Sequence, residues 1–192
     1  MKRNVLKTAV IGQSFVGKTA LCQALTNRAI DREFTSTIGV DYMVSYKRTD
    51  EIDLAIWDLA GLERFESIIG SYIRNSAVLV FCYSAESIES YYKMIEKYDM
   101  WESRRYIKNK RIIIVATKID SKYVNRGYDQ WPKAFLEETG YPFVKTSAIE
   151  KIGIKELNDE CVGKDDSEEL TTINLKSYSN LKNKERYSCC LF

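Results

Sequence analysis

Residues 12–19 are the segment of the chain that most constrains its fold. They read GQSFVGKT, a complete G-x-x-x-x-G-K-[ST] sequence. Residues 5–11 precede it as an apolar run typical of a buried strand, and residues 20–25 follow it with the apolar spacing of a helix. A strand, a glycine-containing loop and a helix in this order indicate a loop that wraps phosphate groups. The alternative, a turn that holds a lysine by chance, does not require these two neighbours.

This loop offers several groups to a phosphate chain. Its glycines let the backbone turn so that amide N–H groups and the start of the helix face the anion. Lys18 can reach the β- and γ-phosphates, and the hydroxyl of Thr19 can ligate Mg²⁺. We therefore expect a nucleoside triphosphate here, with contacts from Ser14, Phe15, Val16, Gly17, Lys18, Thr19 and Ala20.

Short apolar runs alternate with helix-like stretches along the chain. We expect strands at residues 5–11, 40–48, 52–58, 77–83, 111–116 and 141–145, and helices at 18–28, 66–74, 88–106, 130–139 and 153–162. This alternation predicts an α/β fold with a mainly parallel six-stranded sheet and helices on both faces. The connection between the second and third strands is too short for a parallel crossover, so one strand should pair antiparallel.

Length and composition set the outer limits of the prediction. The 192 residues suit one domain over 1–163 and a flexible tail over 164–192, where the apolar pattern fails. The net charge of +2 does not indicate nucleic-acid binding, and we expect the local excess of basic residues near the C-terminus. The N-terminal residues lack a secretory cleavage pattern, and an odd number of cysteines suits a reduced cytosolic chain. The cysteines expected in the core are Cys22, Cys82 and Cys161.

Residues 56–61, IWDLAG, end a predicted strand with an acidic residue. The carboxylate of Asp58 can hold Mg²⁺ through water, and Gly61 lets its amide approach a γ-phosphate without obstruction by a Cβ. Such a sequence is common in turns, but a phosphate loop upstream makes the magnesium interpretation much stronger.

Residues 113–120, IIVATKID, place another acidic residue at the end of a strand. Asp120 could accept two hydrogen bonds from guanine, through N1–H and the exocyclic amine, and adenine lacks this pair of donors. The stem of Lys118 can cover the base plane. The further contacts expected for the base are Thr117, Ser147 and Ala148, the last two presenting a backbone N–H to guanine O6. The predicted ligand is GTP or GDP.

Together these segments resemble the Ras superfamily of small GTPases over residues 5–162, and within it the Rab family. Residues 36–42 (STIGVDY) are similar to the Rab switch I, residues 63–68 (ERFESI) resemble its switch II, and residues 71–77 are a weaker match. The resemblance implies a small G-domain that hydrolyses GTP, with Mg²⁺ held by Thr19, Thr37 and Asp58. It also implies an effector surface made by Ile38, Tyr42, Trp57 and Tyr72, for which ordinary aromatic core packing is the alternative.

The chain departs from the family pattern beside the phosphates. Leu62 stands where the family normally has the glutamine that orients the attacking water, so no catalytic residue is assigned and hydrolysis should be slow. Leu59 replaces the usual threonine. Phe15 occupies a position that is usually small, where its ring could crowd an incoming arginine or turn outward against switch I. Ile30 replaces the usual aromatic residue at the guanine edge, which predicts loose nucleotide retention.

The chain ends in SCCLF. Cys189 with a C-terminal Phe fits a C-a-a-X prenylation signal, and Cys189 with Cys190 also resembles the doubly modified Rab ending. Basic residues at 182, 184 and 186 would add attraction to anionic lipid. We expect a lipid-anchored protein on the cytoplasmic face of an intracellular membrane, with a cytosolic pool.

The partners expected from the resemblance are an exchange factor, an activating protein, effectors, and the prenylation and membrane-extraction machinery; we expect a monomer that binds no nucleic acid. Three other interpretations remain open: a GTP-bound recruitment module that scarcely hydrolyses, a Ras-like or Rho-like signalling GTPase, and a P-loop kinase or ATPase. Leu62 favours the first. Thr117 and the C-a-a-X ending suggest the second, although the stretch between Asp120 and Ser147 looks too short for the inserted helix of Rho proteins. Asp120 argues against the third.

Overall fold

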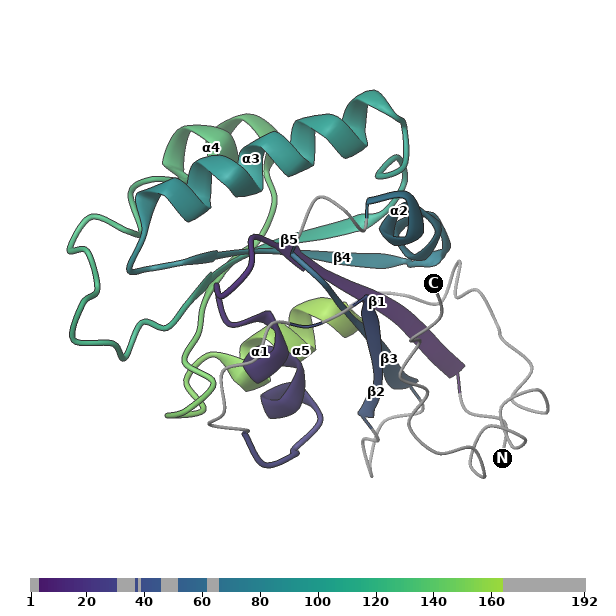
Figure 1. The fold of residues 1–192 in the computed structure, drawn as a ribbon, viewed down its shortest axis with the longest axis horizontal. Coiled ribbons are helices and arrows are strands. Elements are labelled where there is room, and N and C mark those ends of the chain that lie inside the picture. Colours follow the sequence, from purple (N-terminus) through teal and green to yellow (C-terminus); the bar gives the residue numbers. More distant parts are fainter. Residues whose placement is uncertain (1–3, 31–36, 38, 46–51, 62–65, 164–192) are drawn as a thin grey trace.

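The computed structural model describes residues 4–30, 37, 39–45, 52–61 and 66–163. Strands and helices alternate along them (Figure 1). The strands are β1 (Asn4–Gly12), β2 (Val40–Ser45), β3 (Ile52–Leu59), β4 (Val78–Ser84), β5 (Arg111–Thr117) and β6 (Phe143–Lys145). The helices are α1 (Lys18–Leu25), α2 (Glu66–Asn75), α3 (Ile88–Ser103), α4 (Lys133–Thr139) and α5 (Ile154–Val162). Each predicted element is present, with boundaries that differ by a few residues.

The six strands form one sheet in the order β2-β3-β1-β4-β5-β6. β2 and β3 pair antiparallel, with Tyr42 opposite Trp57, and every other neighbouring pair is parallel. The predicted α/β class, with a mainly parallel sheet and one antiparallel strand, is therefore confirmed.

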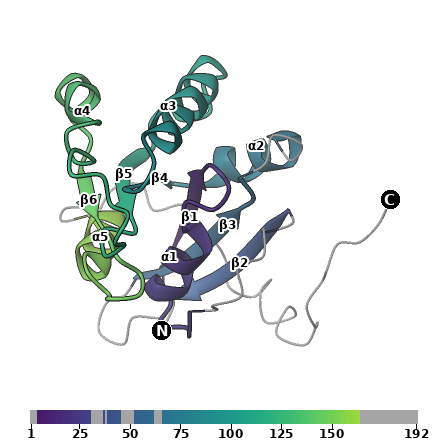
Figure 2. The same ribbon diagram turned by 60° about the vertical axis from the view of Figure 1, so that its left-hand side comes forward.

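Helices cover both faces of the sheet. Figures 1 and 2 show α1 and α5 on one face and α2, α3 and α4 on the other. β4 is buried along its whole length, which is why its sequence is continuously apolar rather than alternating. The predicted core cysteines are confirmed: Cys22, Cys82 and Cys161 are free thiols with no exposed surface, packed on the α1 and α5 face.

Two helices end earlier than their apolar spacing predicts. α1 was expected to reach residue 28 but stops at Leu25, where the Thr26 hydroxyl donates to the Cys22 carbonyl at 2.8 Å and Asn27 takes a φ of 54°. α3 stops at Ser103, and Arg105 takes a φ of 58°. A residue in this left-handed conformation cannot continue a right-handed helix, and periodicity does not reveal it.

The carboxyl ends of the parallel strands β1, β3 and β5 lie at the same end of the sheet, toward the left in Figure 1. In open parallel sheets, ligands bind at the carboxyl ends of the strands where the strand order reverses, and here that point lies at β1. Across the part of the chain that the structure describes, every helix is too short or too polar to cross a bilayer.

Candidate nucleotide and magnesium site

The predicted phosphate loop joins β1 to α1 at this end of the sheet. Gly12 ends β1 so close to β4 that a Cβ would lie 2.5 Å from the Cys82 carbonyl oxygen. Gly17 has a φ of 98°, a conformation that favours glycine, and α1 starts at the next residue. The sequence therefore needs glycine at both ends of the loop for local steric reasons. The other predicted contacts of this segment are Ser14, Phe15 and Val16 in the loop and Lys18, Thr19 and Ala20 in the first turn of α1.

The ammonium of Lys18 lies inside the loop. Lys18 is buried, and its Nζ donates to the Gln13 carbonyl oxygen at 2.8 Å. Burial lowers the pKa of Lys18, and the nearby carboxylate of Asp58 partly offsets this effect. A phosphate group would favour the charged ammonium in the same way, so the loop is suited to an anionic ligand.

Three oxygen-bearing side chains from separate segments meet beside Lys18. The Thr19 hydroxyl donates to Oδ2 of Asp58 at 2.6 Å and lies 3.0 Å from the Thr37 hydroxyl. Asp58 is fully buried at the end of β3, and its Oδ1 has no hydrogen-bond partner among the residues that the structure describes. Burial raises the pKa of Asp58, although the Thr19 hydroxyl and the Lys18 charge lower it. A buried carboxylate oxygen without a partner, next to two hydroxyls, fits the hard oxygen ligands that Mg²⁺ prefers.

Gly61 packs directly on the backbone of the phosphate loop. A Cβ at this position would overlap the Ser14 amide nitrogen and the Gln13 carbonyl carbon. Ala60, one residue earlier, donates its amide to the Gly39 carbonyl oxygen at 2.9 Å, which ties the end of β3 to the start of β2. The side-chain oxygen of Ser14 is buried and has no hydrogen-bond partner within the described part of the chain. The sequence predicted Gly61 near the γ-phosphate, and the structure brings it against the loop.

The end of β5 supplies the residues predicted to contact the base. The Thr117 hydroxyl donates toward the Val16 carbonyl oxygen at 2.5 Å and lies 2.9 Å from the Tyr83 carbonyl oxygen. Thr117 therefore connects the phosphate loop to the centre of the sheet. The stem of Lys118 lies over Gly17, with two of its carbons 3.7 Å from the position of a Cβ there. Asp120 is exposed, so its carboxylate is accessible to a ligand from solvent.

The segment after β6 lies beside these residues. Ile119 donates its amide to the Thr146 carbonyl oxygen at 3.3 Å, which places Ser147 and Ala148 next to the predicted base contacts. Ser147 is buried, and Ala148 is half-buried. The chain from Asp120 to Ser147, all of it described, contains one α-helix, α4. It has no second helix of the kind that Rho proteins insert.

Glu86 is a neighbour of the site that sequence reasoning missed. Its Oε2 accepts from Lys118 Nζ at 2.9 Å, and its Oε1 accepts from the Ser121 hydroxyl at 2.5 Å. A single acidic residue in the turn between β4 and α3 gives no signal in the sequence. Only the sheet order, which places β4 beside β5, brings Glu86 to this segment.

The aromatic residues predicted as an effector surface form a continuous cluster. The rings of Tyr42 and Trp57 are 4.5 Å apart, and those of Trp57 and Tyr72 are 4.8 Å apart. All three are half-buried, so each keeps part of its ring at the surface. Phe15 is a separate case: the residue is 67% exposed, so its side chain lies largely in solvent, and its φ is 64°.

Several predicted residues lie outside the described part of the chain. They are Ile38, Leu62, Cys189, Cys190 and the tail over 164–192.

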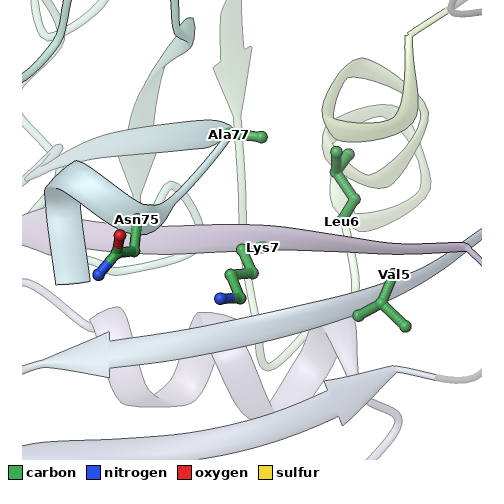
Figure 3. A pocket seen from close by; sticks show the side chains of 5 residues that line it. All are labelled: Val5, Leu6, Lys7, Asn75 and Ala77. Atoms are coloured by element: carbon green, nitrogen blue, oxygen red, sulfur yellow. The ribbon is translucent and has the colours of Figure 1, made fainter. Parts of the chain in front are cut away.

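A small pocket lies elsewhere, near the amino end of β1. Figure 3 shows its lining of Val5, Leu6, Lys7, Asn75 and Ala77. Its volume of about 10 Å³ is enough for roughly one water molecule, so it is no candidate for a nucleotide.

Comparison with known proteins agrees with this geometry. The model of the Ras family matches residues 7–165. The GTP-binding protein YPTM1 of Zea mays is 34% identical over 159 residues, covering 79% of this chain and 74% of the relative. The Ras-related protein Rab-18 of Caenorhabditis briggsae is 34% identical over 163 residues, covering 83% and 79%. The Ypt/Rab-type GTPase ypt7 of Schizosaccharomyces pombe is 28% identical over 166 residues, covering 81% and 79%. With its phosphate loop, its mixed sheet and these relatives, the chain belongs to the Ras family and is a small GTPase close to the Rab proteins.

Proposed function

We propose that this GTPase is a Rab-like switch of membrane traffic that binds GTP or GDP with Mg²⁺ at the carboxyl ends of its parallel strands. The observation that carries the proposal is the meeting of Thr19, Thr37 and Asp58 beside the buried ammonium of Lys18. These residues come from α1, the segment before β2 and the end of β3, so only this fold brings them together.

Each group has a distinct part in this proposal. Thr19, Thr37 and Asp58 would hold Mg²⁺, which neutralises phosphate charge when bound. Lys18 binds the β- and γ-phosphates, and the Gly61 amide reports the presence of the γ-phosphate. Asp120 selects guanine, because pairing with adenine would leave its carboxylate without donors.

Isothermal titration calorimetry on the purified full chain tests nucleotide binding. With Mg²⁺ present, GTP and GDP should release heat at micromolar concentrations, and ATP should release far less. No heat with either guanine nucleotide would refute the proposal, and equal binding of ATP would favour a P-loop kinase or ATPase instead.

We further propose that hydrolysis is slow. The side chain of Leu62 has no donor or acceptor with which to orient water, and phosphoryl transfer depends on such positioning. Single-turnover cleavage of GTP by this chain should be much slower than by a Leu62→Gln variant. The variant should recover activity only partly, because Leu59 and Phe15 remain.

The same measurement decides between two functions. If the chain cleaves GTP no faster than buffer does, it acts as a GTP-bound recruitment module; Leu62 favours this second candidate. An ordinary family rate without the glutamine would contradict the proposed impairment. Release of a fluorescent GDP analogue tests the expected loose retention, because Ile30 lacks the ring edge that would hold guanine.

The aromatic cluster supports effector binding, because the rings of Tyr42, Trp57 and Tyr72 contact one another yet keep part of their surface exposed. We propose that effectors dock there and that Ile38 belongs to the same surface. An exchange factor and an activating protein would act at the nucleotide edge. A Ras-like or Rho-like signalling role remains the alternative at this level.

Membrane residence is proposed from the sequence of the tail. Lipid on Cys189, with or without Cys190, would hold the chain on the cytoplasmic face of an intracellular membrane. Prenylation and extraction machinery would maintain a cytosolic pool. Mass spectrometry of the intact protein from eukaryotic cells tests this, and an unmodified C-terminus would refute the anchor.

A further inference from the structure

A group of exposed cations lies at the end of the sheet opposite the nucleotide site. The loop between α3 and β5 has four basic residues and no acidic residue over positions 104–110. Arg74, in the last turn of α2, lies beside it, with its guanidinium carbon 4.6 Å from the ring centre of Tyr106. The exposed members, Arg74, Arg104, Arg105 and Lys108, are called here the basic platform. The sequence prediction placed the local excess of basic residues near the C-terminus and overlooked residues 104–110, which Arg74 joins only in the folded chain.

Aromatic rings hold two of these cations in place. The guanidinium of Arg104 lies 5.0 Å from the ring centre of Trp101. Trp101 and Tyr106 are themselves stacked, with ring centres 5.6 Å apart and planes inclined by 19°. Trp101 is buried, so the aromatic pair belongs to the core and gives Arg74 and Arg104 a fixed support.

The loop that carries the platform is also anchored to α2. Lys110 donates from its ammonium to the carbonyl oxygens of Arg74 at 2.9 Å and Ser76 at 2.5 Å. Gly70 packs on the Tyr106 ring, where a Cβ would lie 3.2 Å away. Figure 1 shows the end of α3 and the following loop beside α2, on the right, away from the loops of the nucleotide edge. Lys110 is therefore structural, and the exposed members remain in solvent.

We propose that the basic platform binds the anionic phospholipid surface of the membrane and orients the GTPase on it. Guanidinium groups held against aromatic rings can form paired hydrogen bonds with the phosphate oxygens of lipid headgroups. Two acidic residues of α3 lie nearby, Asp99 and Glu102. Glu102 accepts from the Tyr98 hydroxyl at 3.3 Å, and the platform keeps a net positive charge.

This inference rests on the proposed membrane anchor. Residues 164–188 separate the domain from the predicted lipid-bearing cysteines. At about 3.3 Å per residue they can span roughly 80 Å, so the tether alone leaves the orientation of the domain undetermined. A charged surface on the domain supplies an orientation that the tether does not.

Vesicle sedimentation with the full, unlipidated chain tests the platform. The probes are vesicles of phosphatidylcholine alone and vesicles that also contain phosphatidylserine. The chain should bind only the anionic vesicles, and added salt should weaken this binding. An Arg105→Asn/Lys108→Gln variant should bind about 25-fold more weakly, since each cation near an anionic surface contributes about fivefold. Asparagine suits position 105 because it tolerates the left-handed conformation.

The matched control is Lys133→Gln/Lys155→Gln, which removes the same charge from exposed positions at the starts of α4 and α5. It should bind as the unmodified chain does, and Arg74→Gln should weaken binding without altering the loop. Equal binding of the anionic vesicles by the platform and control variants would overturn the proposal. The tail would then account for the membrane contact, and an acidic protein would be the other candidate for the platform. Fluorescent GDP binding by the same samples reports separately on the proposed nucleotide site.

Discussion

The ammonium of Lys118 lies 2.9 Å from Oε2 of Glu86, so the residue predicted to cover the base is held by an ion pair from the turn after the neighbouring strand β4. Glu86 also accepts hydrogen bonds from the hydroxyls of Ser121 and Ser84. Burial alone would raise the pKa of Glu86, but the hydrogen bonds from Ser121 and Lys118 outweigh it and keep the pKa below its usual value. The carboxylate is therefore ionised at neutral pH and can position Lys118.

Replacing Glu86 with glutamine should speed the release of GDP. Glu86→Gln keeps the shape of the side chain but removes the charge that holds Lys118. Because both partners are partly exposed, the pair contributes at most about 1 kcal/mol, or roughly fivefold in rate. Stopped-flow release of a fluorescent GDP analogue measures this change.

The control for this prediction is Glu96→Gln, which removes an exposed ion pair with Lys93 on α3. Its release rate should match that of the unmodified chain. Equal rates for all three proteins would show that Glu86 does not position Lys118 for nucleotide binding.

Most of the fold could be predicted from the sequence because its signals are local. The apolar runs of β1, β4 and β5 and the short connection between β2 and β3 each specify one element or one pairing. The helix ends could not be predicted as well, because they depend on side-chain bonds such as that of Thr26 to Cys22. Pro142 similarly precedes β6, which starts two residues later than its apolar run.

Part of the candidate site could be predicted from the sequence, because the type of a residue and its position on a strand were enough to place it there. Asp58, Thr117 and Asp120 stand at or just after strand ends that the sheet brings to one edge. Glu86 was not predictable, because its contact with Lys118 requires β4 to lie next to β5. The contact of Arg74 with Tyr106 was missed for the same reason, since α2 and the loop after α3 are distant in the sequence.

A methyl group at Gly61 should disturb the phosphate loop. In a Gly61→Ala variant the Cβ would overlap the backbone at Gln13 and Ser14, so the end of β3 must move away from the loop. We expect GTP affinity to fall by tenfold or more and GDP affinity to fall less, as measured by calorimetry. Gly127→Ala is the control, because a Cβ there finds no atom closer than 3.6 Å. Equal losses for GTP and GDP would contradict the proposed contact with the γ-phosphate.

Retention of GDP by Mg²⁺ should weaken as the pH falls. Burial raises the pKa of Asp58, so protons compete with Mg²⁺ for this carboxylate at a higher pH than for an exposed aspartate. The carboxylate holds the metal above its raised pKa and releases it as the pH falls toward that value. No histidine is present to titrate between about pH 5 and 8. Mg²⁺ should slow GDP release, and the size of this slowing should decrease toward acid pH. In an Asp58→Asn variant, Mg²⁺ should slow release little at any pH. A slowing by Mg²⁺ that does not change with pH would count against Asp58 as a metal ligand.

Removing one hydroxyl at Thr117 should loosen the phosphate loop and lower stability together. Thr117→Val keeps the shape of the side chain but leaves the buried carbonyl oxygens of Val16 and Tyr83 without this donor. An unsatisfied buried acceptor costs about 1–3 kcal/mol, which corresponds to a fall in melting temperature of roughly 2–12 °C for a domain of this size. GDP should also leave faster, because the loop loses its bond to β5. Thr139→Val removes a comparable hydroxyl bond, to the Phe135 carbonyl within α4, and should leave GDP release unchanged. A Thr117→Val variant that is less stable but releases GDP at the original rate would show that this bond supports the sheet and not the nucleotide site.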